Sequence, residues 1–445
     1  MAWILQFKVG NVGEIEMIKM PLIVTAIFGC FLIVSVPPAA AQNWPQWRGP
    51  LATGEALSGN PPIEWSEEKN VRWKIPLTGT GKSTPAVWGN TIFVTSAQTT
   101  GDDVIKSGIV TASKPVKFLV IAVDRQSGKV LWERLAREEI PHQTRNDMGA
   151  WATASPITDG KRVYAFFGSR GLFCYDFDGK LVWEKDFGDM DTGGDMGEGV
   201  SPVLYKDKLI VNWDHYGEDF IAALEASTGR EIWRKTRDER ISWTTPLVVE
   251  DGARVQVITV AEKWIKSYDI ANGDGIWQTE GVRYNNISTP VAADGIVYVG
   301  SGLQEGWIKA IRLDGAKGNI TGTSSILWAF EKLYPYVPSP FVMGGLLYFT
   351  KDRVGFLTCL DAATGKVHYS NTRLQGIRHI FASPSGVKDR VYFVGQNGVT
   401  VVVRHGPEFE VLATNTLDDE FDASPVIVGD EIYLRGDHYL YRISK

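Results

Sequence analysis

The chain has 445 residues, of which 44% are hydrophobic and 22% are charged, and this composition is ordinary for a folded globular protein. Its formal net charge of −6 gives no excess of basic residues to hold a phosphate backbone. Nucleic acid is therefore excluded as an expected partner.

The first 41 residues are predicted to be a signal peptide. Lys19 precedes the uncharged segment 22–36, and the small residues of 39–41 occupy the positions that a signal peptidase reads. We expect cleavage after Ala41 and a periplasmic or extracellular location. Stable membrane insertion is not expected, because the uncharged segment is shorter than a comfortable membrane span.

Two features of this leader leave alternatives open. Glu14 and Glu16 are unusual in the positive end of a signal peptide, so Met17 or Met20 is an alternative start. Cys30 offers a lipid attachment point, although Phe28 fits poorly before it and the apolar run continues past it.

After an N-terminal extension at 42–69, residues 70–445 read as one repeat domain. A Ser/Thr/Ala-rich tripeptide ends in proline eight times and runs into a short apolar strand, with gaps of 71, 46, 44, 44, 50, 44 and 41 residues. These prolines are Pro85, Pro156, Pro202, Pro246, Pro290, Pro340, Pro384 and Pro425. A period in the forties with several short strands per unit is typical of a β-propeller.

Residues 201–233 show the internal pattern of one unit. Strands are predicted from Val203, over 209–212, over 220–224 and over 231–233, and turn residues separate them. Gly229 ends the last turn, where a left-handed backbone favours a residue without a Cβ atom. Four short strands per unit predict a four-stranded antiparallel blade.

A large aromatic residue ends the fourth strand of most units. These residues are Trp132, Trp183, Trp233, Trp277, Trp328 and Tyr369. Because they recur with the repeat, we interpret them as structural residues that pack against the neighbouring blade, and not as stacking surfaces for a ligand.

The two ends of the repeat domain are predicted to share one blade. The eighth unit stops after three strands at Ile443, and residues 70–75 resemble the missing outer strand, with Trp73 in place of the repeated aromatic residue. The predicted fold is therefore an all-β, eight-bladed β-propeller whose ring is closed by an N-terminal strand. We expect a monomer.

Additional length lies in the polar stretches 98–117 and 136–149 and in the loop 186–199. Asp189, Asp191 and Asp195 have the spacing of a calcium loop, but Val200 stands where a bidentate glutamate is needed, so a solvated loop is favoured. Cys174 and Cys359 fall four units apart, and a disulfide requires close Cα atoms, so both are predicted to be free and buried.

The candidate site consists of residues just before the proline motifs, because these segments cross the rim of the central channel. They are Lys82, Trp151, Glu198, Trp243, Asn285, Asn286, Tyr336, Arg378, His379 and Asp422. Such polar and aromatic groups suit a pocket for a polar ligand. The alternatives are an ordinary water-filled mouth and, for His379, a structural hydrogen bond.

The segments 124–132 (DRQSGKVLW), 225–233 (EASTGREIW) and 361–369 (DAATGKVHY) resemble the repeat of the pyrroloquinoline-quinone (PQQ) propeller superfamily. Residues 43–50 (NWPQWRGP) are also similar to the mature start of exported propellers of this type. The resemblance implies either a quinone-dependent alcohol or sugar dehydrogenase or a noncatalytic exported scaffold, such as the propeller lipoprotein of the barrel-assembly machinery.

The dehydrogenase alternative implies PQQ and calcium at the channel mouth. Glu198, Asn286 or Asn285, and Asp422 would bind calcium, Asp422 would act as the base, and Trp243 would lie under the quinone. The adjacent cysteine pair of the alcohol dehydrogenases is absent from the sequence. We therefore favour a scaffold that binds a protein or a small polar ligand at the rim, with no catalytic residue and no cofactor. Hydrolysis by rim carboxylates is a third alternative.

Overall fold

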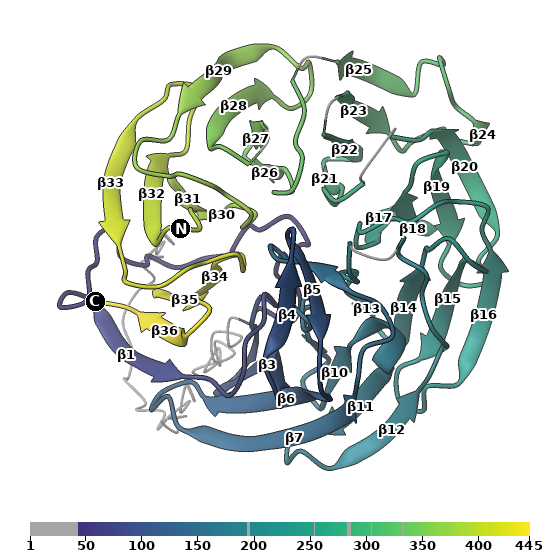
Figure 1. Ribbon diagram of the computed structural model, residues 1–445. Helices are drawn as coiled ribbons and strands as arrows, with labels where there is room; N and C mark the ends of the chain where they lie inside the picture. Colours follow the sequence, from purple (N-terminus) through teal and green to yellow (C-terminus); the bar gives the residue numbers. More distant parts are fainter. Residues whose placement is uncertain are drawn as a thin grey trace, which may run out of the picture. The chain divides into compact units, whose positions relative to one another are not determined.

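The structure, a computed structural model, describes residues 43–193, 196–252, 254–282, 286–303, 305–331, 333–351 and 353–445, which belong to the compact unit Ala41–Lys445 (Figure 1). The predicted signal peptide, together with Asp195 and Asn285, lies outside these residues. The described part of the chain holds no helix with the length and apolar character needed to cross a membrane.

The described residues form an all-β fold, with one 3-10 turn, η1 (Gly168–Arg170). Figure 1 shows the sheets following one another around a common centre. The first large sheet contains β2 (Ala86–Trp88), β3 (Thr91–Thr99), β6 (Val116–Asp124) and β7 (Val130–Glu139), and the second contains β9 (Ile157–Thr158), β10 (Arg162–Phe166), β11 (Leu172–Asp176) and β12 (Leu181–Lys185). The third contains β13 (Val203–Tyr205), β14 (Lys208–Trp213), β15 (Phe220–Glu225) and β16 (Glu231–Thr236). The fourth contains β17 (Leu247–Asp251), β18 (Arg254–Val260), β19 (Trp264–Asp269), β20 (Gly275–Glu280) and the short parallel strand β24 (Gly318–Asn319).

The remaining large sheets have the same antiparallel order. The fifth contains β21 (Val291–Ala293), β22 (Ile296–Gly302), β23 (Gly306–Arg312) and β25 (Ile326–Phe330), and the sixth contains β26 (Phe341–Met343), β27 (Leu346–Lys351), β28 (Phe356–Asp361) and β29 (Val367–Arg373). The seventh contains β30 (Ser385–Val387), β31 (Arg390–Val394), β32 (Val399–Arg404) and β33 (Val411–Thr416). The eighth contains β34 (Val426–Val428), β35 (Glu431–Arg435), β36 (Tyr439–Ile443) and β1 (Val71–Pro76). In the last sheet, β1 pairs antiparallel with β36, so strands from both ends of the described chain meet.

Each repeated proline directly precedes the innermost strand of its sheet, and the Ser or Thr before it binds the next sheet. In each case, the backbone N–H of this residue donates to the side-chain hydroxyl of the equivalent residue one repeat later, with N···O distances of 2.9 to 3.2 Å. We call this set the hydroxyl circle. Its members are Thr84, Ser155, Ser201, Thr245, Thr289, Ser339, Ser383 and Ser424, and the N–H of Ser424 donates to Thr84.

The outer tryptophans bind the next sheet as predicted. The indole N–H groups of Trp132, Trp183, Trp233 and Trp328 donate to the backbone carbonyls of Phe177, Ala226, Ile270 and Ala362, each just past the third strand of the next sheet, at 2.7 to 3.1 Å. The turn glycine of that sheet covers the ring. A Cβ atom on Gly179, whose φ is +79°, would lie 2.7 Å from the Trp132 ring.

Two repeated aromatic residues depart from this arrangement. Trp277 donates instead to Gln256 of its own sheet at 2.9 Å, and β24 pairs alongside it in place of a neighbouring turn. Tyr369 packs against Phe409, with ring centroids 5.6 Å apart. In both places a different loop joins the third strand of the following sheet to its outer strand, with residues 313–325 after Trp277 and residues 405–410 after Tyr369.

The N-terminal extension crosses the inner strands of several sheets. Trp44 is buried and exchanges backbone hydrogen bonds with Val87. The buried guanidinium of Arg48 donates to the carbonyls of Pro340 and Pro384 at 2.7 Å each, and burial lowers its pKa to about 9. This segment therefore ties the inner strands of distant repeats together.

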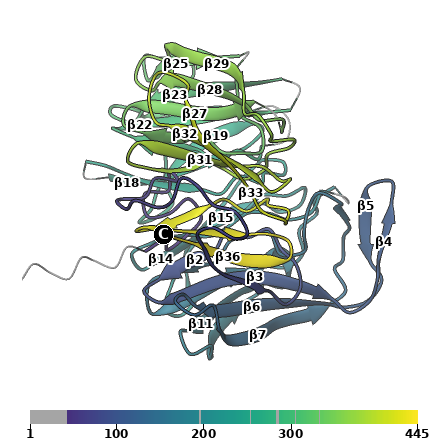
Figure 2. The same cartoon turned by 90° about the vertical axis from the view of Figure 1, so that its left-hand side faces the viewer.

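The first insertion forms structure that the sequence analysis did not predict. Strands β4 (Asp103–Lys106), β5 (Ile109–Ala112) and β8 (Arg145–Asn146) form a separate three-stranded sheet in the order β4-β5-β8. Figure 2 shows β4 and β5 standing clear of the other sheets. We call the hairpin 103–112 the flap. A Ser-Gly turn between two β-branched runs was the available signal.

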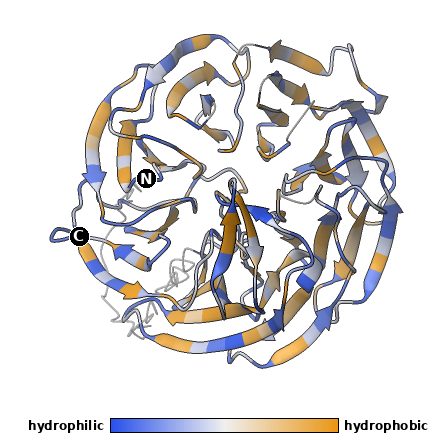
Figure 3. Cartoon of the chain, viewed as in Figure 1, coloured by the Kyte–Doolittle hydropathy of each residue, from blue (hydrophilic) through white to orange (hydrophobic). Residues whose placement is uncertain are grey.

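Apolar side chains fill the spaces between the sheets, and Figure 3 shows hydrophobic segments on strands all around the centre. Cys174 on β11 and Cys359 on β28 are free and buried, which confirms the prediction for both. Burial raises the pKa of each thiol to about 12.

We predict that Thr289→Val will destabilise the fold more than Thr289→Ser. The valine has nearly the same shape but leaves the buried N–H of Thr245 without its acceptor, which costs about 1–3 kcal/mol. Urea unfolding of the purified variants measures the difference. Equal unfolding midpoints for Thr289→Val and the wild type would contradict a stabilising role for the hydroxyl circle.

Candidate functional site

A cavity of about 260 Å³ lies at the ends of the segments that lead into the inner strands. Five of the predicted residues line it, namely Lys82, Glu198, Trp243, Tyr336 and Asp422. Other lining residues come from the extension, the insertions, the hydroxyl circle and two further loops. They include Trp47, Arg145, Met148, Met196, Arg353 and Phe381.

Hydroxyl groups and one indole form part of the cavity wall. Thr84, Ser155, Ser201, Ser383 and Ser424 of the hydroxyl circle line the cavity, and all five are buried. Trp47 donates its indole N–H to the Ser424 hydroxyl at 3.2 Å. The residues that join the sheets therefore also shape the cavity.

An ion pair joins two predicted site residues. The Lys82 ammonium contacts Oδ2 of Asp422, and it also donates to the carbonyl of Met148 at 2.7 Å. The other oxygen of Asp422, Oδ1, is buried and has no hydrogen-bond partner within the described residues.

Two further charged groups lie near this pair. Arg435 is buried and donates to the carbonyl of Thr95 at 2.6 Å, and burial lowers its pKa to about 10. Burial raises the pKa of Asp437; Lys82 opposes this shift, and the nearby carboxylate of Asp422 adds to it.

Aromatic rings contribute another part of the cavity wall. Trp243 donates its indole N–H to the carbonyl of Gly197 at 2.9 Å, which fixes its ring beside the loop that carries Glu198. The Arg353 guanidinium lies 5.9 Å from the centroid of Tyr336, and it also approaches the sulfur of Met148 at 3.1 Å. These contacts connect loops that are far apart in the sequence.

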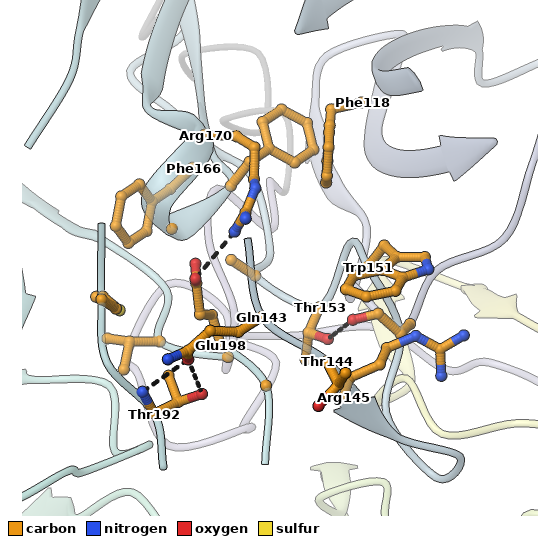
Figure 4. Close-up of a pocket in the computed structure, with 18 residues that line it drawn as sticks. Phe118, Gln143, Thr144, Arg145, Trp151, Thr153, Phe166, Arg170, Thr192 and Glu198 are labelled. Atoms are coloured by element: carbon orange, nitrogen blue, oxygen red, sulfur yellow. Dashed lines mark hydrogen bonds and ion pairs between the residues drawn. The ribbon is translucent and has the colours of Figure 1, made fainter. Parts of the chain in front are cut away.

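Glu198 also lines a second, smaller cavity of about 40 Å³, shown in Figure 4. Its Oε1 accepts from the Ser169 hydroxyl at 2.6 Å and from the Arg170 guanidinium at 2.9 Å, and its Oε2 accepts from the Ser169 N–H at 2.7 Å. Figure 4 shows Arg170 directed at this carboxylate. Both oxygens of Glu198 are therefore engaged.

The two loops around the smaller cavity are bonded together. His142 contacts the carbonyl of Met190 at 2.8 Å through Nε2 and the Arg170 guanidinium at 2.8 Å through Nδ1. Gln143 accepts from both the N–H and the hydroxyl of Thr192, as Figure 4 shows. These bonds hold the second part of the first insertion against the loop that precedes β13.

The flap is anchored at the cavity by two residues. The Trp151 indole N–H donates to Oδ2 of Asp103 at 3.2 Å, and the Arg145 guanidinium contacts the same oxygen at 3.3 Å. The guanidinium also lies 5.0 Å from the centroid of Trp151. Trp151 itself lines the smaller cavity, and Arg145 lines both.

The other predicted site residues lie apart from both cavities. Arg378 and His379 are exposed, and neither lines a cavity. Asn286 is buried, and its amide fits best between the carbonyl of Val282 and the N–H of Glu262. Its backbone carbonyl accepts from the N–H of Trp243 at 2.8 Å, which gives it a structural role. Asn285 is outside the described residues.

Trp47 was not predicted as a residue of the site, and neither was Arg145 or Arg170. Trp47 comes from the extension and reaches the cavity only through tertiary packing. Arg145 lies in an insertion, and Arg170 follows a second strand, so neither precedes a repeated proline. Only Trp47 had a signal, because it stands in the quoted motif NWPQWRGP.

Three described residues were named for calcium under the dehydrogenase alternative, and each already has another partner. Glu198 gives both oxygens to Ser169 and Arg170, the Asn286 amide is turned to backbone groups, and Asp422 is paired with Lys82. The described residues contain no group of three or more His, Cys, Asp or Glu side chains placed to hold a metal ion. The described part of the site therefore offers no ready oxygen cage.

The repeat domain matches a known protein family along its whole length. The model of the family described as outer membrane protein assembly factor BamB matches residues 60–201, 178–326 and 217–445. The chain belongs to this family. No curated protein sequence matches it.

Solved structures share the fold of this BamB-family chain. BamB from Moraxella catarrhalis is 14% identical, with a TM-score of 0.59 over 84% of this chain and 97% of that one. A europium-containing methanol dehydrogenase is 12% identical, with a TM-score of 0.59 over 88% and 89%. The computationally designed Ika8 protein is 13% identical, with a TM-score of 0.53 over 83% and 100%. At these identities the likeness shows the β-propeller fold alone.

We predict that Asp437→Asn will stabilise the protein at neutral pH and that the gain will shrink near pH 4. The carboxyl group has a raised pKa in the folded state, so its contribution to stability is present below its ordinary pKa and is lost as pH rises through the raised value.

Urea unfolding of the wild type and Asp437→Asn from pH 4 to pH 8 measures this effect. The matched control is Asp314→Asn, which removes an exposed carboxylate. A constant difference between wild type and Asp437→Asn across this range would show that burial of Asp437 does not raise its pKa.

Proposed function

We propose that this BamB-family chain is an exported, noncatalytic scaffold that binds a partner protein, with a small polar ligand as the alternative occupant of its central cavity. We further propose that the eight large sheets are the blades of a closed eight-bladed propeller. The hydroxyl circle supports this count, because its eight bonds lead from Thr84 through every sheet and back. Residues 1–41 act as the signal peptide, which gives a periplasmic or extracellular location.

Exposed apolar residues around the cavity carry the proposal. Val104 and Ile105 on the flap are 55% and 66% exposed, and Met148 and Met196 are also exposed beside the cavity that they line. Large apolar side chains gathered on one face of a soluble protein typically mark a protein contact. The loops that carry them belong to the insertions and not to the repeat.

The bonding within the cavity supports binding rather than catalysis. Glu198 forms an ion pair with Arg170, and Lys82 forms one with Asp422, so these charges hold the loops in place. A rigid surface loses little conformational entropy when it binds. By likeness to the assembly factors that name its family, the partner is a protein of the cell envelope.

Cross-linking in native envelopes tests the scaffold. We expect a photoreactive amino acid at Ile105 or at Met196 to capture the same partner protein. The same amino acid at Leu181, an exposed residue on the outer strand β12, is the matched control. If neither position gives an adduct, or if Leu181 gives the same adduct, the protein does not bind its partner through the cavity face.

A quinone titration tests the dehydrogenase alternative. We expect PQQ with calcium to leave the tryptophan fluorescence of the protein at its calcium-free level, because Glu198 and the Asn286 amide are engaged elsewhere and Asp422 is paired with Lys82. A saturable, calcium-dependent quench that Trp243→Ala abolishes would replace the scaffold with a PQQ-dependent enzyme.

A further inference from the structure

The flap offers an open strand edge beside the central cavity. We propose that β4 is a strand-addition site, which binds an extended segment of a partner protein with the pattern acidic–x–apolar–x–basic as a fourth strand of the sheet β4-β5-β8. This inference rests on the proposed scaffold function and names its mode of binding. Within the described residues, β4 pairs only with β5.

The hairpin geometry shows which backbone groups of β4 point outward. Ser107 and Gly108 form a two-residue turn with φ values of +54° and +78°, as a type I′ turn requires. Lys106 and Ile109 flank this turn and form a hydrogen-bonded pair, so the bonded positions of β4 are Lys106 and Val104. The N–H and C=O groups of Ile105 and Asp103 therefore face the open edge.

The side chains along β4 define what the added strand should carry. Because side chains alternate along a strand, Asp102, Val104 and Lys106 share one face. All three are exposed, and the described residues give Asp102 and Lys106 no ion pair. An antiparallel strand on the open edge would place an apolar residue opposite Val104 and opposite charges across from Asp102 and Lys106.

The direction of the added strand fixes the order of its residues. In an antiparallel pair, the residue opposite Lys106 comes first along the partner, followed by the residue opposite Val104 and then the residue opposite Asp102. The complement therefore reads acidic, any, apolar, any, basic. Backbone hydrogen bonds to Asp103 and Ile105 would supply affinity, and the side-chain pattern would supply specificity.

The place of the flap suits such a partner. Asp103 is held by Trp151 and Arg145, so the open edge is fixed in position at the cavity. Strand edges are normally kept short, covered or blocked by charge. β4 has four residues and ends in Lys106, but its centre presents the exposed Val104 and Ile105. A partner strand would cover both.

A displayed library of random 12-residue peptides, selected on the purified chain, tests the proposal. We expect enrichment of acidic–x–apolar–x–basic sequences. The charge exchange Asp102→Lys with Lys106→Asp should enrich the reverse order, basic–x–apolar–x–acidic. Lys106→Asp alone should weaken an enriched peptide by about 1.4- to fivefold, since each cross-strand pair contributes about 0.2–1 kcal/mol. Lys129→Asp, a change of another exposed lysine, is the matched control.

Hydrogen exchange with the enriched peptide tests the binding mode. The amides of Asp103 and Ile105 should become protected, and those of Val104 and Lys106 should keep the protection that the hairpin already gives. Strand addition would be overturned if no pattern is enriched or if the charge exchange does not reverse the enriched pattern. Protection of the β4 amides without this alternation would also overturn it. If cross-linking at Ile105 still captures a partner in those cases, the scaffold function stands and only the mode falls.

Discussion

The hydrogen bonds of the hydroxyl circle are the constraint on which the rest of this structure depends. Proline has no backbone N–H, so the Ser or Thr that precedes it donates its own N–H to the neighbouring sheet. The acceptor is the side-chain hydroxyl of the equivalent Ser or Thr in the next repeat. This explains why a Ser or Thr stands before each repeated proline. The same bonds set the spacing of the inner strands and bring five hydroxyl groups to the wall of the central cavity.

Tryptophans such as Trp132, Trp183, Trp233 and Trp328 join neighbouring sheets in a similar way at their outer edges. An indole such as that of Trp132 gives its N–H to the next sheet, while the glycine of that sheet's turn lies against its face. Bonds at the inner and outer edges hold neighbouring sheets at a fixed angle. Loops such as the flap are then free to vary, because the sheets remain joined without them.

The cavity combines residues that have different origins. Lys82 and Asp422 come from segments before repeated prolines, Trp47 from the extension, and Arg145 from an insertion. Their charges are paired within the protein, and this pairing fixes the loops. The exposed apolar residues of the flap and of the loops beside it then give one face of the molecule a surface suited to another polypeptide.

The sequence by itself determined the repeat, the strands of each unit and the structural role of most outer tryptophans, because these features recur at a fixed period and answer to local pairing. Tertiary structure decided the rest. Among the residues before the prolines, the structure brings five together around the cavity, namely Lys82, Glu198, Trp243, Tyr336 and Asp422. The Asn286 amide instead contacts backbone groups, and Arg378 and His379 lie outside the cavity. Which groups pair, and where Trp47 and the flap lie, depends on contacts between residues far apart in the chain, and no local pattern encodes such contacts.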